Sequence, residues 1–549
     1  MDIRRTILWM IFIFSVFMVW TNWQMYNAPP APEPTTSNTA TPAVAAGTPS
    51  VATEQANAPS STAPASTSSE KITINTDVYN LTFDTLGAQI VKAELLQHPI
   101  AEDRSTPIVL LDNDTVKYTV QSGLVGPGNL QKNYPNQNTL FTMTSNETKM
   151  TGDKLDVVFT AESDGLKVVR TYTFSKGSYH IVVNDQVSNT SNEVQSPSQY
   201  LQITRDNHEP AGGSSFYPTY TGWAVYSDEE RFQKVTFEEI DKNSADFIKQ
   251  SPDGWVSFIQ HFFVTAWIPE QGKPHTVDLR KVGNNLYAVS TVESLGNLAP
   301  GASASTTSSL WVGPQDQKAL AKVDPTLDLV VDYGWLTIIA KPMFSLMNWI
   351  YSWIGNWGWT IVVLTIIIKL LLYPLSAASY RSMAKMKNVA PRMQALREQY
   401  GDDREKLNAA MMEMYRTEKI NPLGGCLPIL VQIPVFLTLY RVLLASVEMR
   451  GAGWIGWITD LSVRDPYFIL PAIMMATMFL QIKLNPTPPD PMQARIMMIM
   501  PLVFGAMMFM FPAGLVLYWV VNNILSIAQQ WYITRNLNKA ANEQILTHK

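Results

Sequence analysis

The chain has a single cysteine, Cys426, among its 549 residues, so an intramolecular disulfide is impossible. Acidic residues outnumber basic ones only slightly, 46 against 41, a balance that gives no sign of nucleic-acid binding. The sequence contains no Walker loop, no zinc-ligand spacing and no nucleophile placed with a base. We therefore expect a protein that is not an enzyme and that needs no cofactor or metal. Cys426 is expected to pack rather than to react.

Apolar residues are distributed unevenly, although the mean hydropathy is −0.02. They gather at the N-terminus and after Trp349. Residues 1–23 carry two arginines followed by an apolar run that ends at Trp20, without a small-residue cleavage site. This pattern predicts an uncleaved signal-anchor helix. Residues 24–70 are mostly Ala, Pro, Ser and Thr, a composition that is typical of a disordered linker.

Residues 71–326 contain short runs of alternating polar and apolar residues separated by Gly, Asn, Asp and Pro. One such pair of runs surrounds the turn residues 175–178: Leu166, Val168, Tyr172 and Phe174 precede it, and Tyr179, Ile181 and Val183 follow it. The pattern predicts a large antiparallel β-sandwich. The histidines in this region show no metal-ligand spacing and are expected to be structural.

The C-terminal part predicts helices. Residues 327–356 are rich in Trp and Phe and suit an amphipathic helix lying along the membrane–water interface. Residues 357–533 are expected to form a five-helix core, with a turn at Pro512–Gly514 before the last helix and a tail at 534–549. The five predicted spans are 357–373, 423–445, 467–482, 496–511 and 513–533.

Lysine and arginine predict the orientation of these spans. The 374–422 loop carries nine of them and the 448–466 loop carries two, which places 374–422 in the cytoplasm. The predicted fold is therefore a polytopic α-helical membrane protein with six spans and both termini inside. A large β-sandwich lies outside, and a helical hairpin lies in the cytoplasm.

Lys369 lies within a predicted span among branched aliphatic residues, and no acidic residue occurs in any of the five predicted spans of residues 357–533. A charge there is costly and usually functional. The alternative is that its stem snorkels to the nearby end of the span. Other polar residues in the spans are Thr365, Gln432, Asn522, Asn523 and Ser526. Each alone most often makes an interhelical hydrogen bond, but together with Lys369 they suggest a hydrated cavity.

The 374–422 loop has apolar residues at helical spacing on both sides of Gly401, which predicts two helices with a kink at Pro391. Its core is expected to close on itself, while its surface also suits contact with apolar segments. The methionines concerned are Met383, Met386, Met393, Met411 and Met414.

Six stretches carry a resemblance to a known family. They are Val331–Trp335, Ser382–Met386, Asn421–Cys426, Asp465–Tyr467, Asp490–Gln493 and Phe511–Tyr518. On these the chain resembles the YidC/Oxa1/Alb3 family of membrane protein insertases, in its Gram-negative form, over nearly its whole length.

The resemblance implies a membrane protein insertase of the bacterial inner membrane, with a positively charged groove that is open to cytoplasm and lipid. Lys369 stands where the best-known members have arginine, so the charge is kept without the guanidinium fork. Thr365 is implied beside the groove, and a slide for the client helix is implied at Phe436, Met474, Met507 and Trp519.

The outer domain is implied to be a periplasmic β-supersandwich similar to sugar-mutarotase folds. The implied partners are nascent membrane proteins, the Sec translocon with SecD–SecF, the ribosome and the lipid bilayer. Two rival functions fit the sequence less well. A secondary transporter of a small solute predicts inverted repeats, which the sequence lacks. An anchored periplasmic binding protein needs fewer spans.

Overall fold

The computed structural model describes residues 69–100, 104–127, 132–210, 219–401, 403–418, 427–485 and 491–547. They divide into two compact units, with the boundary between Asp332 and Tyr333. The predicted signal-anchor, nearly all of the predicted linker, and the Asn421–Cys426 stretch lie outside the described residues.

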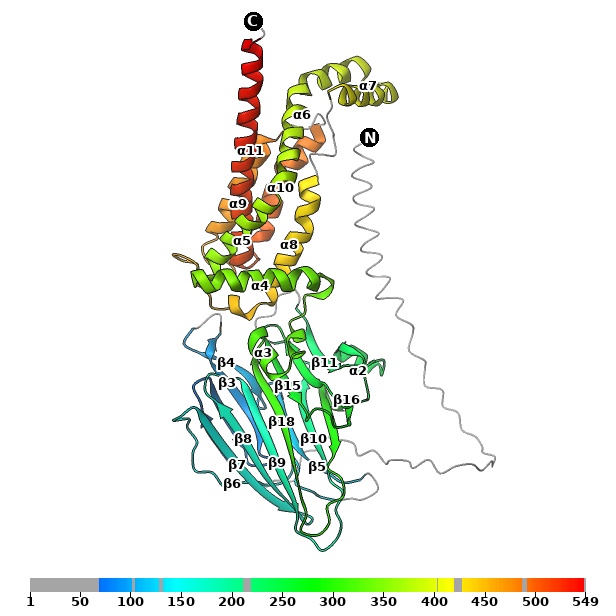
Figure 1. Cartoon of the computed structure of the whole chain (residues 1–549), viewed down its shortest axis with the longest axis vertical. Coiled ribbons are helices and arrows are strands. Elements are labelled where there is room, and N and C mark those ends of the chain that lie inside the picture. The colour runs from blue at the N-terminus through cyan, green and yellow to red at the C-terminus, as the bar shows by residue number, and fades with distance from the viewer. Residues whose placement is uncertain are drawn as a thin grey trace, which may run out of the picture. The chain divides into compact units, whose positions relative to one another are not determined.

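The first unit, the β unit, contains two nine-stranded antiparallel sheets (Figure 1). In order across the first sheet, the strands are β1 (Lys71–Asn75), β2 (Tyr79–Asp84), β3 (Gln89–Pro99), β5 (Thr119–Val125), β10 (Ser198–Asp206), β17 (Leu286–Ser294), β16 (His275–Gly283) and β13 (Gln250–Ser251), with β4 (Pro107–Asp112) paired to β3. In the second sheet they are β12 (Arg231–Val235), β11 (Thr221–Ser227), β14 (Trp255–Gln260), β15 (Phe263–Ile268), β18 (Ser303–Pro314), β9 (His180–Asn189), β8 (Leu166–Ser175), β7 (Lys154–Ser163) and β6 (Thr142–Met143).

Aromatic side chains join the two sheets face to face. The rings of Phe83 on β2 and Phe159 on β7 lie 5.4 Å apart, and Tyr118 lies 5.4 Å from Phe258 on β14. The buried residues alternate along the strands, as the period of two requires. The predicted antiparallel β-sandwich is confirmed. Three short helical elements accompany it: α2 (Phe237–Asp241), α3 (Gln317–Val323) and the 3₁₀ turn η1 (Leu327–Val330).

The β8–β9 hairpin forms about the turn that the sequence predicted, and it places a charged pair in the core. Arg170 on β8 shares the buried parity of Leu166 and Phe174 and is fully buried. The hairpin register sets it opposite Asp185 on β9, and the two make a bidentate ion pair with distances of 2.7 and 2.8 Å. A guanidinium N–H also reaches the carbonyl of Ser122 in the other sheet, at 3.0 Å.

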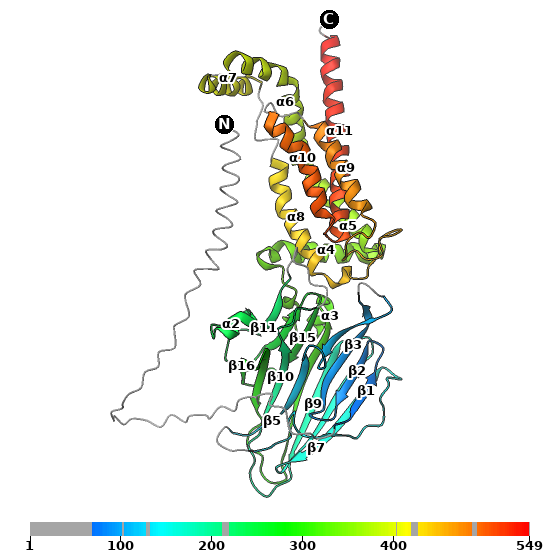
Figure 2. The same ribbon diagram turned by 180° about the vertical axis from the view of Figure 1, so that it is seen from behind.

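The second unit, the helical unit, contains eight α-helices among the described residues. They are α4 (Thr337–Ile354), α5 (Trp357–Leu371), α6 (Tyr373–Tyr400), α7 (Arg404–Thr417), α8 (Leu427–Ala445), α9 (Ile469–Leu484), α10 (Pro491–Met508) and α11 (Ala513–Thr547), with the 3₁₀ turns η2 (Gly334–Leu336) and η3 (Val447–Met449). The longest, α11, packs against α5, α6, α8 and α9, and α4 lies crosswise at one end of the bundle (Figure 1, Figure 2).

Local signals explain where α4 ends and α5 begins. Gly355 takes a left-handed conformation after α4, with φ of 68°, which glycine adopts without steric cost. Asn356 then caps α5 by accepting a hydrogen bond from the backbone N–H of Trp359, at 3.0 Å.

Judged on length and composition, none of the described helices is by itself long and apolar enough to cross a membrane. Taken together, α5 and the first half of α6 meet that test, although they are bent by 67° at their junction. The arrangement of six spans therefore stays a prediction.

Several helix boundaries differ from the sequence-based expectation. The longest difference is in α11, which continues to Thr547 through the predicted tail 534–549. The region 327–356, which was predicted as one amphipathic helix, is α-helical only from Thr337. The 3₁₀ turns η1 and η2 precede this helix, and Gly334, the first residue of η2, has a φ of 62°, which does not occur within an α-helix. The turn that was predicted at Pro512–Gly514 lies between Met508, where α10 ends, and Ala513, where α11 begins. The backbone N–H groups of Ala513 and Gly514 donate to the carbonyls of Val463 and Leu461, which lie in the loop between α8 and α9.

Candidate functional site

Lys369 lies two residues before the end of α5 and is buried, with 8% of the residue exposed. Its ammonium donates a hydrogen bond to the hydroxyl of Ser526 on α11, at 2.7 Å. Ser526 in turn donates to the backbone carbonyl of Asn522, at 2.8 Å. Among the described residues, the group that accepts a hydrogen bond from the buried Lys369 ammonium is therefore a neutral hydroxyl and not a carboxylate.

Lys369 lines a cavity of about 300 Å³ in the helical unit, with walls from α5, α6, α8, α9 and α11. The other polar side chains that line it are Ser376, Tyr380, Gln432, Gln481, Asn485, Asn522, Asn523 and Ser526. None of the described lining residues is acidic. The cavity therefore combines one cation with five carboxamides, and no negative charge faces it from these residues.

Three of the carboxamides form hydrogen bonds with residues that do not line the cavity. Gln432 donates to the hydroxyl of Tyr518 at 2.5 Å, and Asn523 donates to the hydroxyl of Thr477 at 3.2 Å. The side-chain oxygen of Asn485 accepts from Gln530 at 3.0 Å. The side-chain oxygen of Asn522 is buried and accepts no hydrogen bond from the described residues.

One part of the cavity wall is apolar and aromatic. Phe436 on α8 and Trp519 on α11 both line the cavity, and their rings lie 4.9 Å apart. Phe504 on α10 lies 5.1 Å from Trp519 and extends the aromatic contact beyond the lining. Polar and apolar walls thus meet within one cavity.

Seven of the ten residues predicted for the groove and the client-helix slide meet at this cavity: Lys369, Gln432, Phe436, Trp519, Asn522, Asn523 and Ser526. Three others do not line it. Thr365 is buried and its hydroxyl donates to the carbonyl of Ile361 in its own helix, at 2.7 Å. Met474 is fully buried, whereas Met507 is 42% exposed on α10. The roles of all ten stay predictions.

Sequence reasoning missed four polar lining residues: Ser376, Tyr380, Gln481 and Asn485. Gln481 falls at the end of the predicted span 467–482 and Asn485 lies three residues beyond it, where polar residues are common. Their spacing of four residues places both on one face of the chain as it leaves α9, and this was the available signal.

The predicted hairpin methionines separate into two places. Met383 on α6 lines the cavity and packs beside Ala377, Tyr380 and Ile533. Met393 and Val389 pack against Met414 and Tyr415 of α7. The remaining two, Met386 and Met411, are half-buried. Pro391 lies inside α6, and the ribbon changes direction before it meets α7 (Figure 1).

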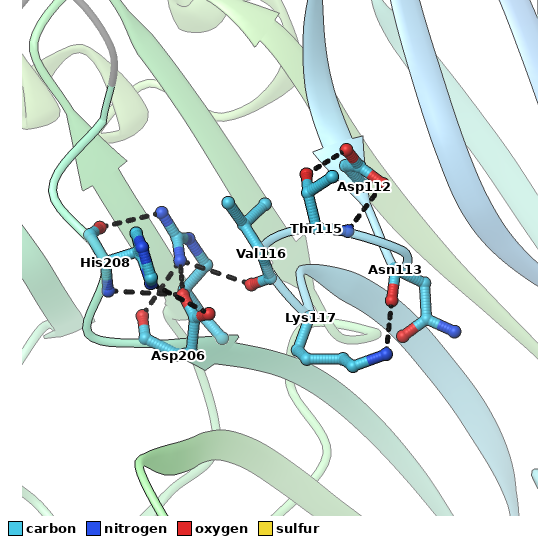
Figure 3. A network of polar contacts seen from close by, with 8 residues as sticks. Asp112, Asn113, Thr115, Val116, Lys117, Asp206 and His208 are labelled. Carbon is cyan, nitrogen blue, oxygen red and sulfur yellow. Dashed lines mark hydrogen bonds and ion pairs between the residues drawn. The ribbon is translucent and has the colours of Figure 1, made fainter.

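A second polar network, in the β unit, is structural. The turn at Asp112–Lys117 lies opposite the segment Asp206–His208 (Figure 3). The buried Arg205 joins them by donating to the carbonyls of Val116 and His208, at 3.3 and 2.9 Å. These bonds tie the chain entering β5 to the chain leaving β10. In the described residues, no group of three or more His, Cys, Asp or Glu side chains could hold a metal ion.

Two family models match this chain. The model of the YidC periplasmic domain matches residues 71–346, and that of the 60Kd inner membrane protein matches residues 349–540. The membrane protein insertase YidC of Bordetella avium is 60% identical over 556 residues, covering 98% of this chain and 99% of that protein. The chain belongs to the YidC family of membrane protein insertases.

The chain is also similar to a second insertase and to a solved structure. The YidC insertase of Cupriavidus metallidurans is 50% identical over 554 residues, with 98% of each chain covered. A solved structure of an active YidC insertase with its first transmembrane domain resolved is 17% identical, with a TM-score of 0.40, and covers 85% of this chain and 93% of that chain.

Family membership confirms the family predicted from the sequence and the inner-membrane location with a periplasmic domain. It also confirms that the protein is an insertase and not an enzyme. The span count, the cytoplasmic position of α6 and α7, and the Sec and ribosomal partners stay predictions.

Proposed function

We propose that this YidC-family protein inserts client membrane segments by drawing a client's polar stretch into the cavity beside Lys369. The client's apolar segment then leaves past Phe436 and Trp519 into lipid. The observation that carries this proposal is the juxtaposition of a buried ammonium, five carboxamides and an aromatic wall in one cavity.

The electrostatics of the cavity support the proposal. A polar segment that crosses lipid without partners is strongly disfavoured, because every unsatisfied polar group costs several kcal/mol there. Lys369 supplies a positive charge whose bond to Ser526 is to a neutral group, so an arriving carboxylate meets no competing anion among the described lining residues. An acidic stretch of the client gains a charged hydrogen bond on entry.

The lengths of the helices support a shortened path through the bilayer. The helix α5 has 15 residues and α9 has 16, which at ~1.5 Å per residue gives about 22 and 24 Å. Both values are below the ~30 Å thickness of bilayer hydrocarbon. Local thinning of the bilayer around these helices would reduce the barrier further.

The proposed topology has six spans, with both termini and the α6–α7 pair in the cytoplasm, as the nine basic residues of 374–422 suggest. The helix α4 exposes Ile338, Trp349 and Trp353 by 86, 59 and 78%, which suits a helix embedded in the membrane–water interface. The proposed partners are nascent membrane proteins, received from the Sec translocon with SecD–SecF or directly from the ribosome.

The test is to reverse the charge of the cavity. Cells depleted of the native protein are complemented with Lys369→Glu, and insertion of a small phage coat protein with an acidic tail is followed by protease accessibility. We expect insertion to fall at least tenfold, because the cavity would then repel the tail. Lys369→Arg, which keeps the charge, should retain most of the activity.

Lys483→Glu is the matched control, since Lys483 is an exposed cation near the end of α9 that does not line the cavity. It should insert the same client at the normal rate. Normal insertion by Lys369→Glu at equal expression would overturn the proposed role of the charge.

A further inference from the structure

We infer that the cavity binds the peptide backbone of an extended client segment, with the carboxamide of Asn522 and the ammonium of Lys369 as its two contacts. The inference rests on the proposed function and specifies its substrate. The class of ligand is a polypeptide stretch without regular secondary structure, whose own N–H and C=O groups are unpaired.

The acceptor side of this site is Asn522. The residue lines the cavity and is 6% exposed, yet its side-chain oxygen accepts no hydrogen bond from the described residues. A buried acceptor without a donor is destabilising, and most such groups in native proteins are paired. Rotation of the carboxamide about its Cβ–Cγ bond would present this oxygen to a ligand N–H in the cavity, which would then pair it.

The donor side is Lys369. An ammonium has three N–H groups, and its bond to Ser526 uses one of them. The hydroxyl proton of Ser526 is already directed to the backbone carbonyl of Asn522, which ties this serine to its own helix. The remaining ammonium N–H groups can therefore donate to a ligand carbonyl beside the acceptor of Asn522.

A peptide group matches this pair better than an acidic side chain does. A carboxylate only accepts hydrogen bonds and would leave the Asn522 oxygen unpaired, whereas a peptide group carries one donor and one acceptor. The other carboxamides of the lining, on Gln432, Gln481, Asn485 and Asn523, offer the same combination of donor and acceptor. Five carboxamides around one cation thus suit the backbone of any sequence.

The physical need is greatest for a segment that has left water and has not yet formed a helix. Its backbone groups have lost their water partners and have no intrahelical ones, so a wall of carboxamides replaces both. Binding through the backbone also explains how one cavity could receive clients whose tails differ in charge.

The test uses full-length protein in liposomes and a synthetic single-span peptide with an uncharged tail of Ser, Gly and Asn. A second peptide replaces one tail peptide bond by an ester, which removes one N–H and weakens one carbonyl acceptor. A series of such peptides moves the ester along the tail. Insertion rates are measured by protease protection, after subtraction of the rate in empty liposomes.

On the native protein, the ester at its most sensitive position should slow insertion about threefold to tenfold, the factor that an ordinary hydrogen bond is worth. On Asn522→Leu, which keeps the volume but removes the carboxamide, the amide and ester peptides should insert at the same rate. Asn536→Leu, at an exposed position of the same helix, should behave like the native protein.

Equal rates for all amide and ester peptides on the native protein would overturn the inference, as would an ester effect that persists in Asn522→Leu. Sensitivity to acidic tail residues without any ester effect would assign the cavity to side chains instead. Failure of the proposed function looks different, because the all-amide peptide would then insert no faster with the native protein than in empty liposomes.

Discussion

Arg170 in the β unit and Lys369 in the helical unit are both buried cations, but their surroundings are opposite. In the β unit, Arg170 is fully buried and makes a bidentate pair with Asp185, which also accepts a hydrogen bond from Gln199 at 3.0 Å. In the helical unit, Lys369 is buried against the neutral hydroxyl of Ser526 beside a cavity. Charges that are paired and hydrogen-bonded on every side hold a fold together, whereas a buried charge without a counter-charge is available to a ligand.

The largest effect on stability is expected when the ion pair between Arg170 and Asp185 is broken. Arg170→Ala leaves the carboxylate of Asp185 buried without its cation, so the free energy of unfolding should fall by about 3–5 kcal/mol. Urea unfolding of the full-length protein in detergent, followed by tryptophan fluorescence, measures it. The double variant Arg170→Met with Asp185→Leu should recover most of the loss, because both charges are gone. A loss below about 1 kcal/mol for Arg170→Ala would mean that the pair contributes little to the fold.

A smaller effect on stability is expected at Lys369. Lys369→Met removes a buried charge that has no counter-charge among the described residues, so the free energy of unfolding should change by no more than about 1 kcal/mol. Insertion of the acidic-tailed client should nevertheless fall sharply, because the cavity loses its positive charge. The same unfolding and insertion assays apply. A stability loss as large as that of Arg170→Ala would show that Lys369 is structural and would remove the contrast.

The smallest effect is expected at Glu293, a buried carboxyl group that has one cation nearby. Glu293 on β17 is 4% exposed, and neither of its oxygens accepts a hydrogen bond from the described residues. Burial raises the pKa of Glu293, although Lys273, at 3.4 Å, acts in the opposite direction. The folded state therefore binds the proton more tightly than the unfolded chain. The resulting stability is present below about pH 4.5 and is lost as the pH rises through the folded-state pKa.

Glu293→Gln should accordingly raise the free energy of unfolding at pH 7 by on the order of 0.5 kcal/mol, and the gain should vanish below about pH 4.5. The control is Glu270→Gln, since the hydrogen bond from Lys273 lowers the pKa of Glu270. That variant should be less stable than the native protein at neutral pH and equal to it in acid. Unfolding curves at several pH values distinguish the two, and equal signs for both variants would contradict this assignment.

Much of the β unit could be predicted because its signals are local. The turn at 175–178 and the alternation on both sides of it correctly predicted β8 and β9. Arg170 interrupted the apolar alternation and received no role from the sequence. Its partner was nevertheless accessible, since the register of that hairpin places Asp185 directly opposite.

The helical unit was harder, because helix propensity says little about which helices touch. The sequence placed Lys369 and Ser526 in one predicted cavity but could not show their contact. They are 157 residues apart, and their 2.7 Å hydrogen bond depends on how α5 and α11 pack. Thr365 shows the reverse case. It has helical spacing from Lys369, yet its hydroxyl is directed to its own backbone, which a spacing argument cannot reveal.

By itself, the sequence determined the division into an alternating β region and an apolar helical region, and it determined the family. It also identified Lys369 as a charge that is energetically costly to bury in that helical region. These features depend on composition and short-range periodicity, which are written along the chain. Only the tertiary structure decided that Gln481 and Asn485 join the cavity, that Thr365, Met474 and Met507 do not line it, and that Asn522 has an unused acceptor. Such features arise when distant helices meet, and which polar groups then find partners depends on packing that no local pattern encodes.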